Sequence, residues 1–499
     1  MFTRSNRRTL TAAVVCAGAL ALGTPTMAGA VPAQQATTLT ADAGVSAKGA
    51  EKAGQKSQGR PDHAGQSGRP DHAGQSGRPD HAGQSGKPDH AGQPGPPDHA
   101  KGKGKGKGKG PGHGGGEDST GQTQCQFAPE GGEAEGSWDR DSLAGVAPDD
   151  LRIGNIAAGG GHHSDADYPD PFPSDPPYRD HLASEYSSVT HENYLKWEFV
   201  QPEQGVYDFE QADAVVAFAE ANGMDLRGHA LSWHSQNPDW LEEGDFTEAE
   251  LREILEDHVR TVVSRYAGCI DQWDVANEIF QDDEAASIRD SENIWIRELG
   301  PEILDDVFTW AHEEDPEALL FYNDYNVDGL NAKADAYYDL IREQLERGVP
   351  VHGFGAQTHL SMQYGFDDSY QENLQRFDDL GIHTAVTEID VRGEVDENDM
   401  MSPEDRAGAA ERYATVLQAC LEVSLCNSFT IWGTLDAQSW VPNTFPGEGD
   451  ATVHEGDYER KPTYCIIQRT LVEHVEGASA WEDDASFEEC RGILESAGL

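Results

Sequence analysis

Strand-like and helix-like segments alternate along most of this chain, and this alternation restricts its fold more than any other feature. Short apolar runs typical of buried strands lie at 151–156, 225–229, 270–275, 319–322, 353–357, 384–387 and 428–432. Helical periodicity occupies the intervals, at 212–222, 251–266, 303–312, 334–347, 374–380 and 406–423. About eight such units over about 330 residues predict an α/β chain with a parallel sheet, and favour a closed (β/α)8 TIM barrel. An open doubly wound sheet is the alternative, although no GxGxxG or P-loop motif follows a strand.

The first 30 residues have the pattern of an export signal. Three arginines precede an apolar stretch at 10–22, and the small residues 28–30 suit a cleavage site. We therefore predict a signal peptide over 1–30 and a secreted, extracellular protein. The pair Arg7-Arg8 leaves the twin-arginine route open beside the general secretory route. No later run reaches 18 apolar residues, so we expect no membrane span.

A nine-residue repeat dominates the next segment, residues 31–124. The sequence GRPDHAGQS begins at Gly59, Gly68 and Gly77, and a Lys-Gly alternation follows at 101–110. The segment has no aromatic residue and therefore cannot bury enough apolar surface to offset its chain entropy. We predict a disordered, low-complexity linker that acts as a spacer in front of the barrel. Contact with an anionic cell-wall polymer through the lysines, or metal binding by the repeated histidines, are the alternatives.

The charge of the chain is divided between two parts. Residues 1–116 hold 15 basic and 7 acidic residues, whereas the remainder holds 21 basic and 83 acidic residues, a net charge of −62. A nucleic-acid partner is excluded because phosphate contacts need clustered Lys and Arg. We expect most of these acidic groups to form a solvated surface, and we hypothesise an adaptation to high salt, where screening relieves self-repulsion.

Six cysteines remain once Cys16 is removed with the signal: Cys125, Cys269, Cys420, Cys426, Cys465 and Cys490. An even number in an exported chain is compatible with disulfides, and the short spacing makes Cys420–Cys426 the favoured pair. A pair between Cys125 and Cys490 would tie the two ends of the barrel. The sequence has no CxxC and no zinc-type Cys/His cluster, so we predict no metal and no cofactor.

Two glutamates follow predicted strands, which is where the chemistry of a barrel is located. Glu278 follows the strand at 270–275, and Glu388 follows the strand at 384–387. A pair of carboxylates across a cleft is what the cleavage of a glycosidic bond requires. Aromatic and polar residues gather at the other strand ends, and tryptophan faces with amide and imidazole groups suit sugar rings and hydroxyls.

The motifs around these residues resemble those of the family-10 glycoside hydrolases, the endo-1,4-β-xylanases. Residues 271–278 (DQWDVANE) resemble the acid/base motif of that family, and residues 387–390 (TEID) resemble its nucleophile motif. Further matches are Glu192-Asn193, Lys196-Trp197, Arg227-Gly228-His229, Trp233-His234, the YNDYN at 322–326, Gln357-Thr358-His359 and Ile431-Trp432-Gly433. The resemblance covers about residues 138–472.

The resemblance implies a retaining hydrolysis of xylan, with Glu388 as nucleophile and Glu278 as general acid and then base. Their carboxyl groups are expected about 5–5.5 Å apart, and Glu278 needs a raised pKa to hold its proton. Asn277 would hold the sugar 2-hydroxyl, and His359 would orient Glu388. The other substrate-binding residues that the resemblance implies are Glu192, Asn193, Lys196, His229, Trp233, Tyr325, Gln357, Trp432 and Trp440.

Two segments depart from the family pattern and are expected to border the cleft. Residues 159–177 form a Gly/Pro/His-rich insertion after the first strand, and residues 434–458 form a long acidic loop near the last one. We expect a monomeric enzyme whose barrel domain spans 125–499, with its core at about 138–472, and whose partner is xylan or a related β-glycan. A barrel glycosidase for another β-glycan and a catalytically silent glycan-binding protein are the alternatives.

Overall fold

The structure is a computed structural model that describes residues 123–129, 134, 136–161 and 168–499. The predicted signal peptide and nearly all of the predicted linker lie outside these residues. Among the described residues, no helix combines the length and the apolar character that crossing a bilayer requires.

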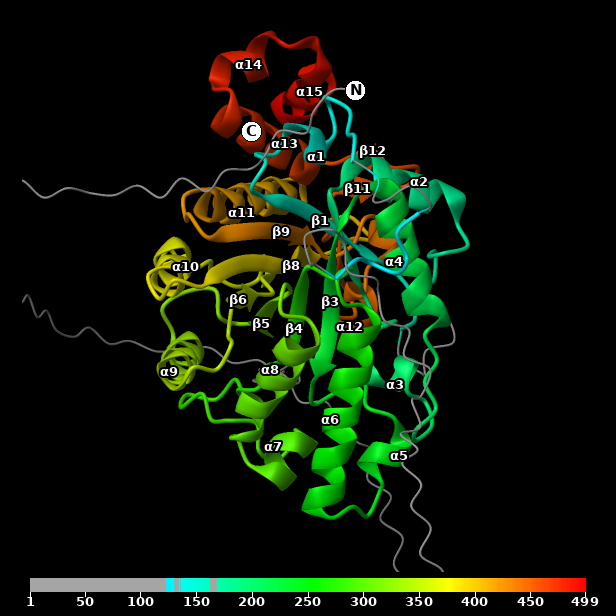
Figure 1. The fold of residues 1–499 in the computed structure, drawn as a ribbon. Helices are drawn as coiled ribbons and strands as arrows, with labels where there is room; N and C mark the ends of the chain where they lie inside the picture. Colours follow the sequence, from blue (N-terminus) through cyan, green and yellow to red (C-terminus); the bar gives the residue numbers. More distant parts are fainter. Residues whose placement is uncertain (1–122, 130–133, 135, 162–167) are drawn as a thin grey trace, which may run out of the picture. The chain divides into compact units, whose positions relative to one another are not determined.

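Eight parallel strands close into a barrel within the described part of the chain (Figure 1). These strands are β1 (Arg152–Ala157), β2 (Ser188–His191), β3 (Asp225–Ser232), β4 (Gln272–Asn277), β5 (Leu319–Asp324), β6 (Gly353–Ala356), β8 (His383–Glu394) and β9 (Cys426–Ile431). Closure comes from β9, which pairs with β8 through Val386↔Phe429 and with β1 through Arg152↔Ser428. The predicted (β/α)8 barrel is therefore confirmed, and the open sheet is excluded.

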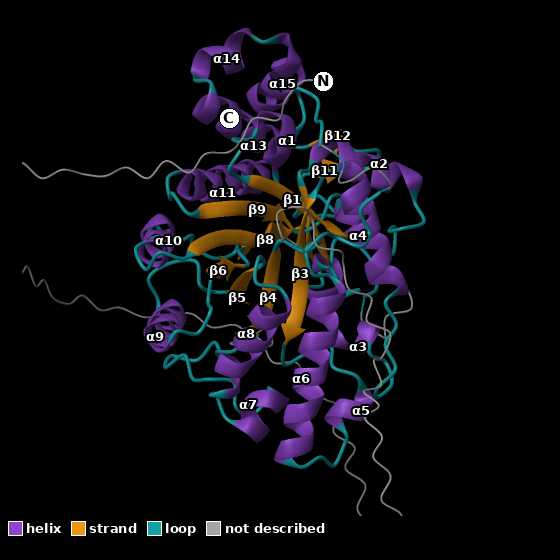
Figure 2. Cartoon of the chain, in the orientation of Figure 1, coloured by secondary structure: helices purple, strands orange, loops and turns teal. Residues whose placement is uncertain are grey.

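One longer helix follows each barrel strand and covers the outside of the barrel (Figure 2). These helices are α2 (Pro176–Glu185), α4 (Glu210–Asn222), α6 (Glu248–Arg265), α8 (Ile303–Glu314), α9 (Ala332–Arg347), α10 (Tyr370–Asp378), α11 (Pro403–Leu421) and α13 (Pro462–Val475). Local sequence sets several of their ends: Thr247 and Glu250 form a capping box before α6, and Gly348 ends α9 at φ 82°. The strands are almost completely buried, as expected for a parallel sheet with covered faces.

Further helices and strands lie outside the eight barrel strands and the eight helices that follow them. The further helices are α1 (Leu143–Val146), α3 (Trp197–Val200), α5 (Asp239–Glu242), α7 (Ile294–Leu299), α12 (Val441–Thr444), α14 (Ala478–Asp483), the ten-residue α15 (Glu488–Ala497) and the 3-10 turns Asp436–Gln438 and Ala485–Phe487. The short strands are β7 (His359–Ser361), β10 (Glu448–Gly449), β11 (His454–Glu455) and β12 (Glu459–Arg460). In Figure 1, α14 and α15 lie beside α13 at one end of the barrel. The acidic loop at 434–458 therefore has secondary structure of its own.

Two strands differ from the sequence prediction. The sequence analysis missed β2, because Ser188–His191 is only four residues long and mostly polar, although all four are buried. The second difference is in β8, which does not end before Glu388 but continues to Glu394. The extension forms because β7 pairs with it beyond the barrel, with His359 opposite Asp390.

Three disulfides join the six cysteines. The predicted Cys420–Cys426 pair is confirmed, but a Cys125–Cys490 pair is wrong: the others are Cys125–Cys269 and Cys465–Cys490. Packing explains the difference, because the chain before Cys125 runs along Gly268, where an added Cβ would lie 2.3 Å from the Thr123 carbonyl oxygen. Cys490 lies on α15, which packs on α13 and its Cys465.

Candidate active site

Four barrel strands bring the central polar residues together at their C-terminal ends. Glu278 follows β4, Asn323 lies near the end of β5, Gln357 follows β6 and Glu388 lies within β8. Glu278 and Glu388 are 8% and 5% exposed, so neither is the freely solvated surface group that most acidic residues of this chain were expected to be.

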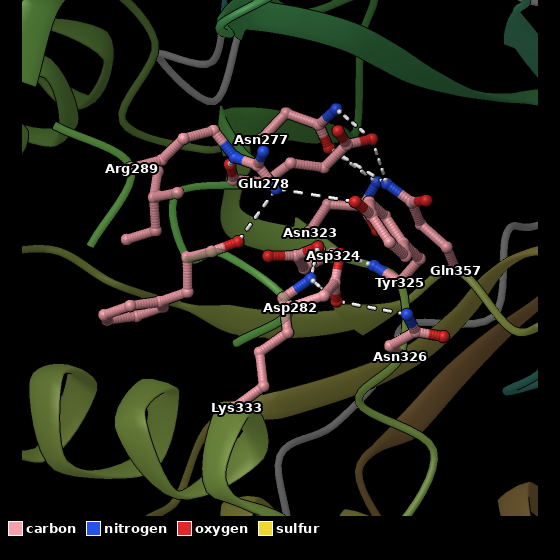
Figure 3. A network of polar contacts seen from close by, with 12 residues as sticks. Asn277, Glu278, Asp282, Arg289, Asn323, Asp324, Tyr325, Asn326, Lys333 and Gln357 are labelled. Atoms are coloured by element: carbon pink, nitrogen blue, oxygen red, sulfur yellow. Dashed lines mark hydrogen bonds and ion pairs between the residues drawn. The ribbon is translucent and has the colours of Figure 1, made fainter. Parts of the chain in front are cut away.

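Asn323 and Gln357 connect the two glutamates in a reciprocal way, and Figure 3 shows the part of this network around Glu278. Asn323 accepts the Glu278 backbone N–H at its carbonyl (2.9 Å) and donates its side-chain amide to Glu388 Oε1 (2.7 Å). Gln357 accepts the Glu388 backbone N–H at its carbonyl (3.1 Å) and donates its side-chain amide to Glu278 Oε1 (3.1 Å). Each glutamate is therefore held through both its backbone and its side chain.

A histidine between two carboxylates supports Glu388. His359 lies 3.2 Å from Glu388 Oε2 through Nε2 and 2.9 Å from Asp390 Oδ2 through Nδ1. Burial alone would lower the pKa of His359, but Asp390 and Glu388 outweigh it and raise the pKa to about 10. His359 is therefore an imidazolium at neutral pH and donates to both carboxylates. Trp440 also binds Asp390, because its indole N–H donates to Asp390 Oδ2 (2.7 Å).

Glu278 has a different environment and a strained backbone. Its φ of 53° is in the left-handed region, which costs a residue with a side chain about 1–2 kcal/mol. Burial favours its neutral form, but His234, Gln357 and Trp233 outweigh burial, so the pKa of Glu278 lies below its usual value, opposite to the expected direction. The strongest opposing contribution needs a charged His234, whose Nδ1 lies 3.7 Å from Glu278 Oε2. Burial lowers the pKa of His234 itself, so this contribution disappears when His234 loses its proton.

Asn277 lies beside Glu278 and Asn323 in the same network (Figure 3). Its amide is best satisfied with the oxygen toward Trp233 Nε1 (3.2 Å) and the nitrogen toward the Asn323 carbonyl (3.1 Å). Trp233 in turn lies beneath Lys196, whose Nζ is 5.0 Å from the indole ring. The structure thus brings Asn277, Trp233 and Lys196 together next to Glu278.

Three of the predicted substrate-binding residues, Glu192, Asn193 and Lys196, are buried and hydrogen-bonded. Lys196 Nζ donates to Asn193 Oδ1 (2.8 Å) and to Gln236 Oε1 (2.7 Å). Glu192 accepts the Gly159 N–H at Oε2 (2.8 Å) and the Tyr168 hydroxyl at Oε1. Burial raises the pKa of Glu192 to about 7 despite these hydrogen bonds. Gly159 and Tyr168, from the described part of the insertion, therefore reach this part of the site.

Aromatic rings line the remaining side. The ring centroid of Trp432 lies 5.6 Å from that of His229 and 6.3 Å from that of His359, and Trp440 lies 4.8 Å from His359. His229 is oriented by Asp274, whose Oδ2 lies 3.0 Å from Nδ1. The row of rings gives the site flat apolar faces next to hydrogen-bonding groups, which is the combination that sugars require.

A second polar cluster on the β4 and β5 side was not predicted as a whole. Lys333 Nζ lies 2.8 Å from Asp324 Oδ1, 3.0 Å from Asp282 Oδ1 and 3.9 Å from the centre of the Tyr325 ring (Figure 3). Of these residues only Tyr325 was predicted to bind substrate. Lys333 lies on α9, away from the strand ends, so no sequence signal marks it. Asn323, Asp324 and Asp390 lie inside the quoted motifs and could have been found as strand-end polar residues.

Among the described residues, the one group with clustered metal-type ligand atoms is Cys125, Glu220 and Cys269. Its two sulfur atoms form a disulfide and offer no thiolate to a metal. This group also lies apart from the strand ends that carry Glu278 and Glu388.

Two buried carboxylates at the C-terminal face of a parallel barrel, beside a row of tryptophans, define this molecule as a barrel glycoside hydrolase. Residues 161–470 match the family model described as glycosyl hydrolase family 10, and the chain belongs to that family.

Relatives that are matched over most of their own length support this membership. Endo-1,4-beta-xylanase B of Thermotoga neapolitana is 37% identical over 300 residues, which cover 59% of this chain and 84% of that protein. Endo-1,4-beta-xylanase of Agaricus bisporus is 35% identical over 292 residues, covering 58% and 85%. The crystal structure of native xylanase 10B from Thermotoga maritima superposes with a TM-score of 0.61 at 36% identity, covering 67% of this chain and 99% of that one.

Proposed function

We propose that the chain is a retaining endo-1,4-β-xylanase in which Glu388 is the nucleophile and Glu278 the general acid and base. The observation that carries this assignment is the asymmetry between the two glutamates. Glu388 contacts a histidinium and an amide, whereas Glu278 contacts the amide of Gln357, the indole of Trp233 and a histidine with a lowered pKa. The names of the relatives support xylan as the substrate.

In the first step a Glu388 carboxylate oxygen attacks the anomeric carbon, and the bond to the leaving sugar oxygen breaks. Glu278 transfers its proton to that oxygen, so that the leaving sugar departs as a neutral hydroxyl. His359 and Asn323 stabilise the negative charge of Glu388 before the attack. Asn323 and Gln357 also hold the two carboxyl groups in position relative to each other.

In the second step water attacks the anomeric carbon of the glycosyl ester, and its proton passes to Glu278. The Glu388 carboxylate leaves, and the configuration at the anomeric carbon is the same as at the start. Because the pKa of Glu278 lies below its usual value, its carboxyl group is ionised once it has given up its proton and is available to accept the proton of the water. Loss of the negative charge on Glu388 in the ester lowers the pKa of Glu278 further.

Two substitutions test the assignment of the glutamates. Glu388→Ala should abolish turnover of xylan but leave binding to xylo-oligosaccharides, and hydrolysis that persists would contradict the nucleophile role. Glu278→Ala should retain activity on a dinitrophenyl xylobioside, which needs no acid, and added azide should accelerate it. Glu284→Ala, an exposed acidic residue of the loop that follows Glu278, is the matched control and should behave like the wild type.

The substrate is tested by the release of reducing sugar from xylan and from cellulose. A β-glucanase would prefer cellulose, and a silent glycan-binding protein would bind either polymer without releasing sugar. A product profile on xylo-oligosaccharides then distinguishes internal cleavage from removal of terminal units.

We also propose that the protein is exported and that residues 1–30 are removed. The three disulfides support this, because such bonds persist in oxidising compartments. Sequencing the amino terminus of the protein from the culture medium should begin at Val31. Retention of the intact chain in the cytoplasm would contradict export.

A further inference from the structure

The Arg289 side chain donates hydrogen bonds to two backbone carbonyls, that of Glu278 and that of the residue two positions later (Figure 3). Its Nε donates to the Glu278 carbonyl (3.0 Å), and one terminal nitrogen donates to the Phe280 carbonyl (3.0 Å). The other terminal nitrogen lies 2.6 Å from Glu292 Oε2, which fixes the direction of the guanidinium. Arg289 is 7% exposed, so these contacts are shielded from water.

The conformation of Glu278 needs support of this kind. A residue with a side chain stays at a φ of 53° only where its surroundings hold it there. The Glu278 N–H is held by the Asn323 carbonyl (2.9 Å), and the Ile279 N–H by the Tyr337 hydroxyl (3.1 Å). Arg289 donates to the carbonyl of Glu278, and its planar guanidinium can hydrogen-bond two acceptors at once.

Arg289 also closes the loop that follows Glu278. Its backbone N–H donates to the Ile279 carbonyl (2.8 Å), and Phe280 and Ile288 form an antiparallel bridge. The terminal nitrogen that contacts Phe280 also lies 3.4 Å from the Tyr325 hydroxyl, on the loop after β5. One guanidinium therefore connects the ends of β4 and β5 at the position of Glu278.

We propose that Arg289 is a positioning residue for Glu278, which fixes the backbone so that the carboxyl group points at the leaving oxygen. The inference rests on the proposed role of Glu278 as general acid. An acid is effective only within hydrogen-bond reach of the atom that it protonates, and a displacement of about 1 Å costs about 100-fold in rate. Arg289 itself touches no reacting atom.

The test compares two aryl xylobiosides with full-length protein. A phenyl leaving group needs a proton from Glu278, whereas a dinitrophenyl group leaves without one. The variants are Arg289→Lys, which keeps the charge but loses the fork, and Arg289→Ala. Arg297→Ala is the matched control, because Arg297 lies on α7 in the same segment and pairs with the exposed Glu298 (2.7 Å). Melting temperatures show that each variant is folded.

We expect Arg289→Lys to lower kcat/KM on the phenyl substrate about 100-fold and on the dinitrophenyl substrate less than about 5-fold. Arg297→Ala should leave both values unchanged. An equal loss on both substrates, or no loss on either, would overturn the positioning role. If the wild type hydrolyses neither substrate, the proposed function itself is wrong, and this inference falls with it.

Discussion

Asn323 and Gln357 exchange roles around the two central glutamates: each gives its carbonyl to the backbone of one glutamate and its side-chain amide to the other. The arrangement ties the end of β4 to β5 and the end of β6 to β8. Since the four residues come from separate strands, the placement of the two carboxyl groups depends on how these strand ends lie relative to one another. The relative position of Glu278 and Glu388 is therefore set by the C-terminal ends of several barrel strands and not by a single loop.

Replacing Asn323 by Asp tests this relationship. The substitution removes the donor 2.7 Å from Glu388 Oε1 and places a second carboxylate there, so we expect kcat on xylan to fall about 100-fold or more. Asn331→Asp is the control, because Asn331 caps α9 and Asp serves equally well in that position. Steady-state kinetics of both variants are compared with the wild type, and a loss of less than threefold in Asn323→Asp would show that the connection is dispensable.

The sequence predicted more of the fold than of the site. The long periodic segments, such as the one that became α6, have clear capping and apolar patterns, and their positions are correct within a few residues. β2 was missed because Ser188–His191 carries no apolar run, and its burial depends on the strands at either side. The helices α2 and α13 were not predicted either, so local pattern found most of the barrel elements but not all of them.

The predicted site residues came from motifs at strand ends, and the structure gathers them there. The sequence could not show their charge states, because those depend on residues far apart in the chain. The expected rise in the pKa of Glu278 is an example: burial acts in that direction, but His234, Gln357 and Trp233 act against it. Lys333, Arg289 and Tyr168 reach the site from a helix and two loops without any motif of their own.

His359 should make stability depend on pH at the alkaline side. Its pKa is about 10 in the folded protein and about 6.5 when unfolded, so folding favours the protonated form. The stabilisation is fully present below about pH 6.5 and is lost as pH rises toward 10. At pH 6 we expect the free energy of unfolding of His359→Gln to be a few kcal/mol lower than that of the wild type. This difference between the two proteins should become smaller as the pH rises to 10. Urea titrations at a series of pH values measure this, and a constant difference would contradict it.

His234 should set the alkaline limit of activity through Glu278. A charged His234 is the largest of the contributions that lower the pKa of Glu278, and the general acid must be protonated to work. Where His234 is protonated, His234→Asn removes that charge, so the pKa of Glu278 rises and the alkaline limb of kcat/KM should move to higher pH. His312→Asn, a histidine on α8, is the control. A limb that stays in place, or moves to lower pH, would rule out this role of His234.

Salt should stabilise the folded protein. The part from Glu117 to Leu499 carries 83 acidic and 21 basic residues, so its net repulsion is large at low ionic strength. The screening length falls from about 10 Å at 0.1 M to about 3 Å at 1 M salt, so we expect the melting temperature to rise steadily over this range. Sucrose, which stabilises without screening, is the control. A melting temperature that falls on adding NaCl would contradict adaptation to salt.

The three disulfides should differ in how much they stabilise the protein, because they close loops of different length. The sequence separations are 144 for Cys125–Cys269, 25 for Cys465–Cys490 and 6 for Cys420–Cys426. Loop-closure entropy then predicts losses of about 5, 3.5 and 2 kcal/mol when each pair is replaced by serine or alanine. Urea unfolding of the three double variants measures these losses.

The position of each bond lets the same variants separate stability from activity. Cys465–Cys490 joins α13 to α15, outside the barrel strands, so its removal should lower the free energy of unfolding while kcat on xylan stays at the wild-type value. Cys420–Cys426 joins α11 to the start of β9, at the end of that strand remote from Trp432, and we expect the same. If the shortest loop proved the most stabilising, contacts in the folded state, and not chain entropy, would dominate.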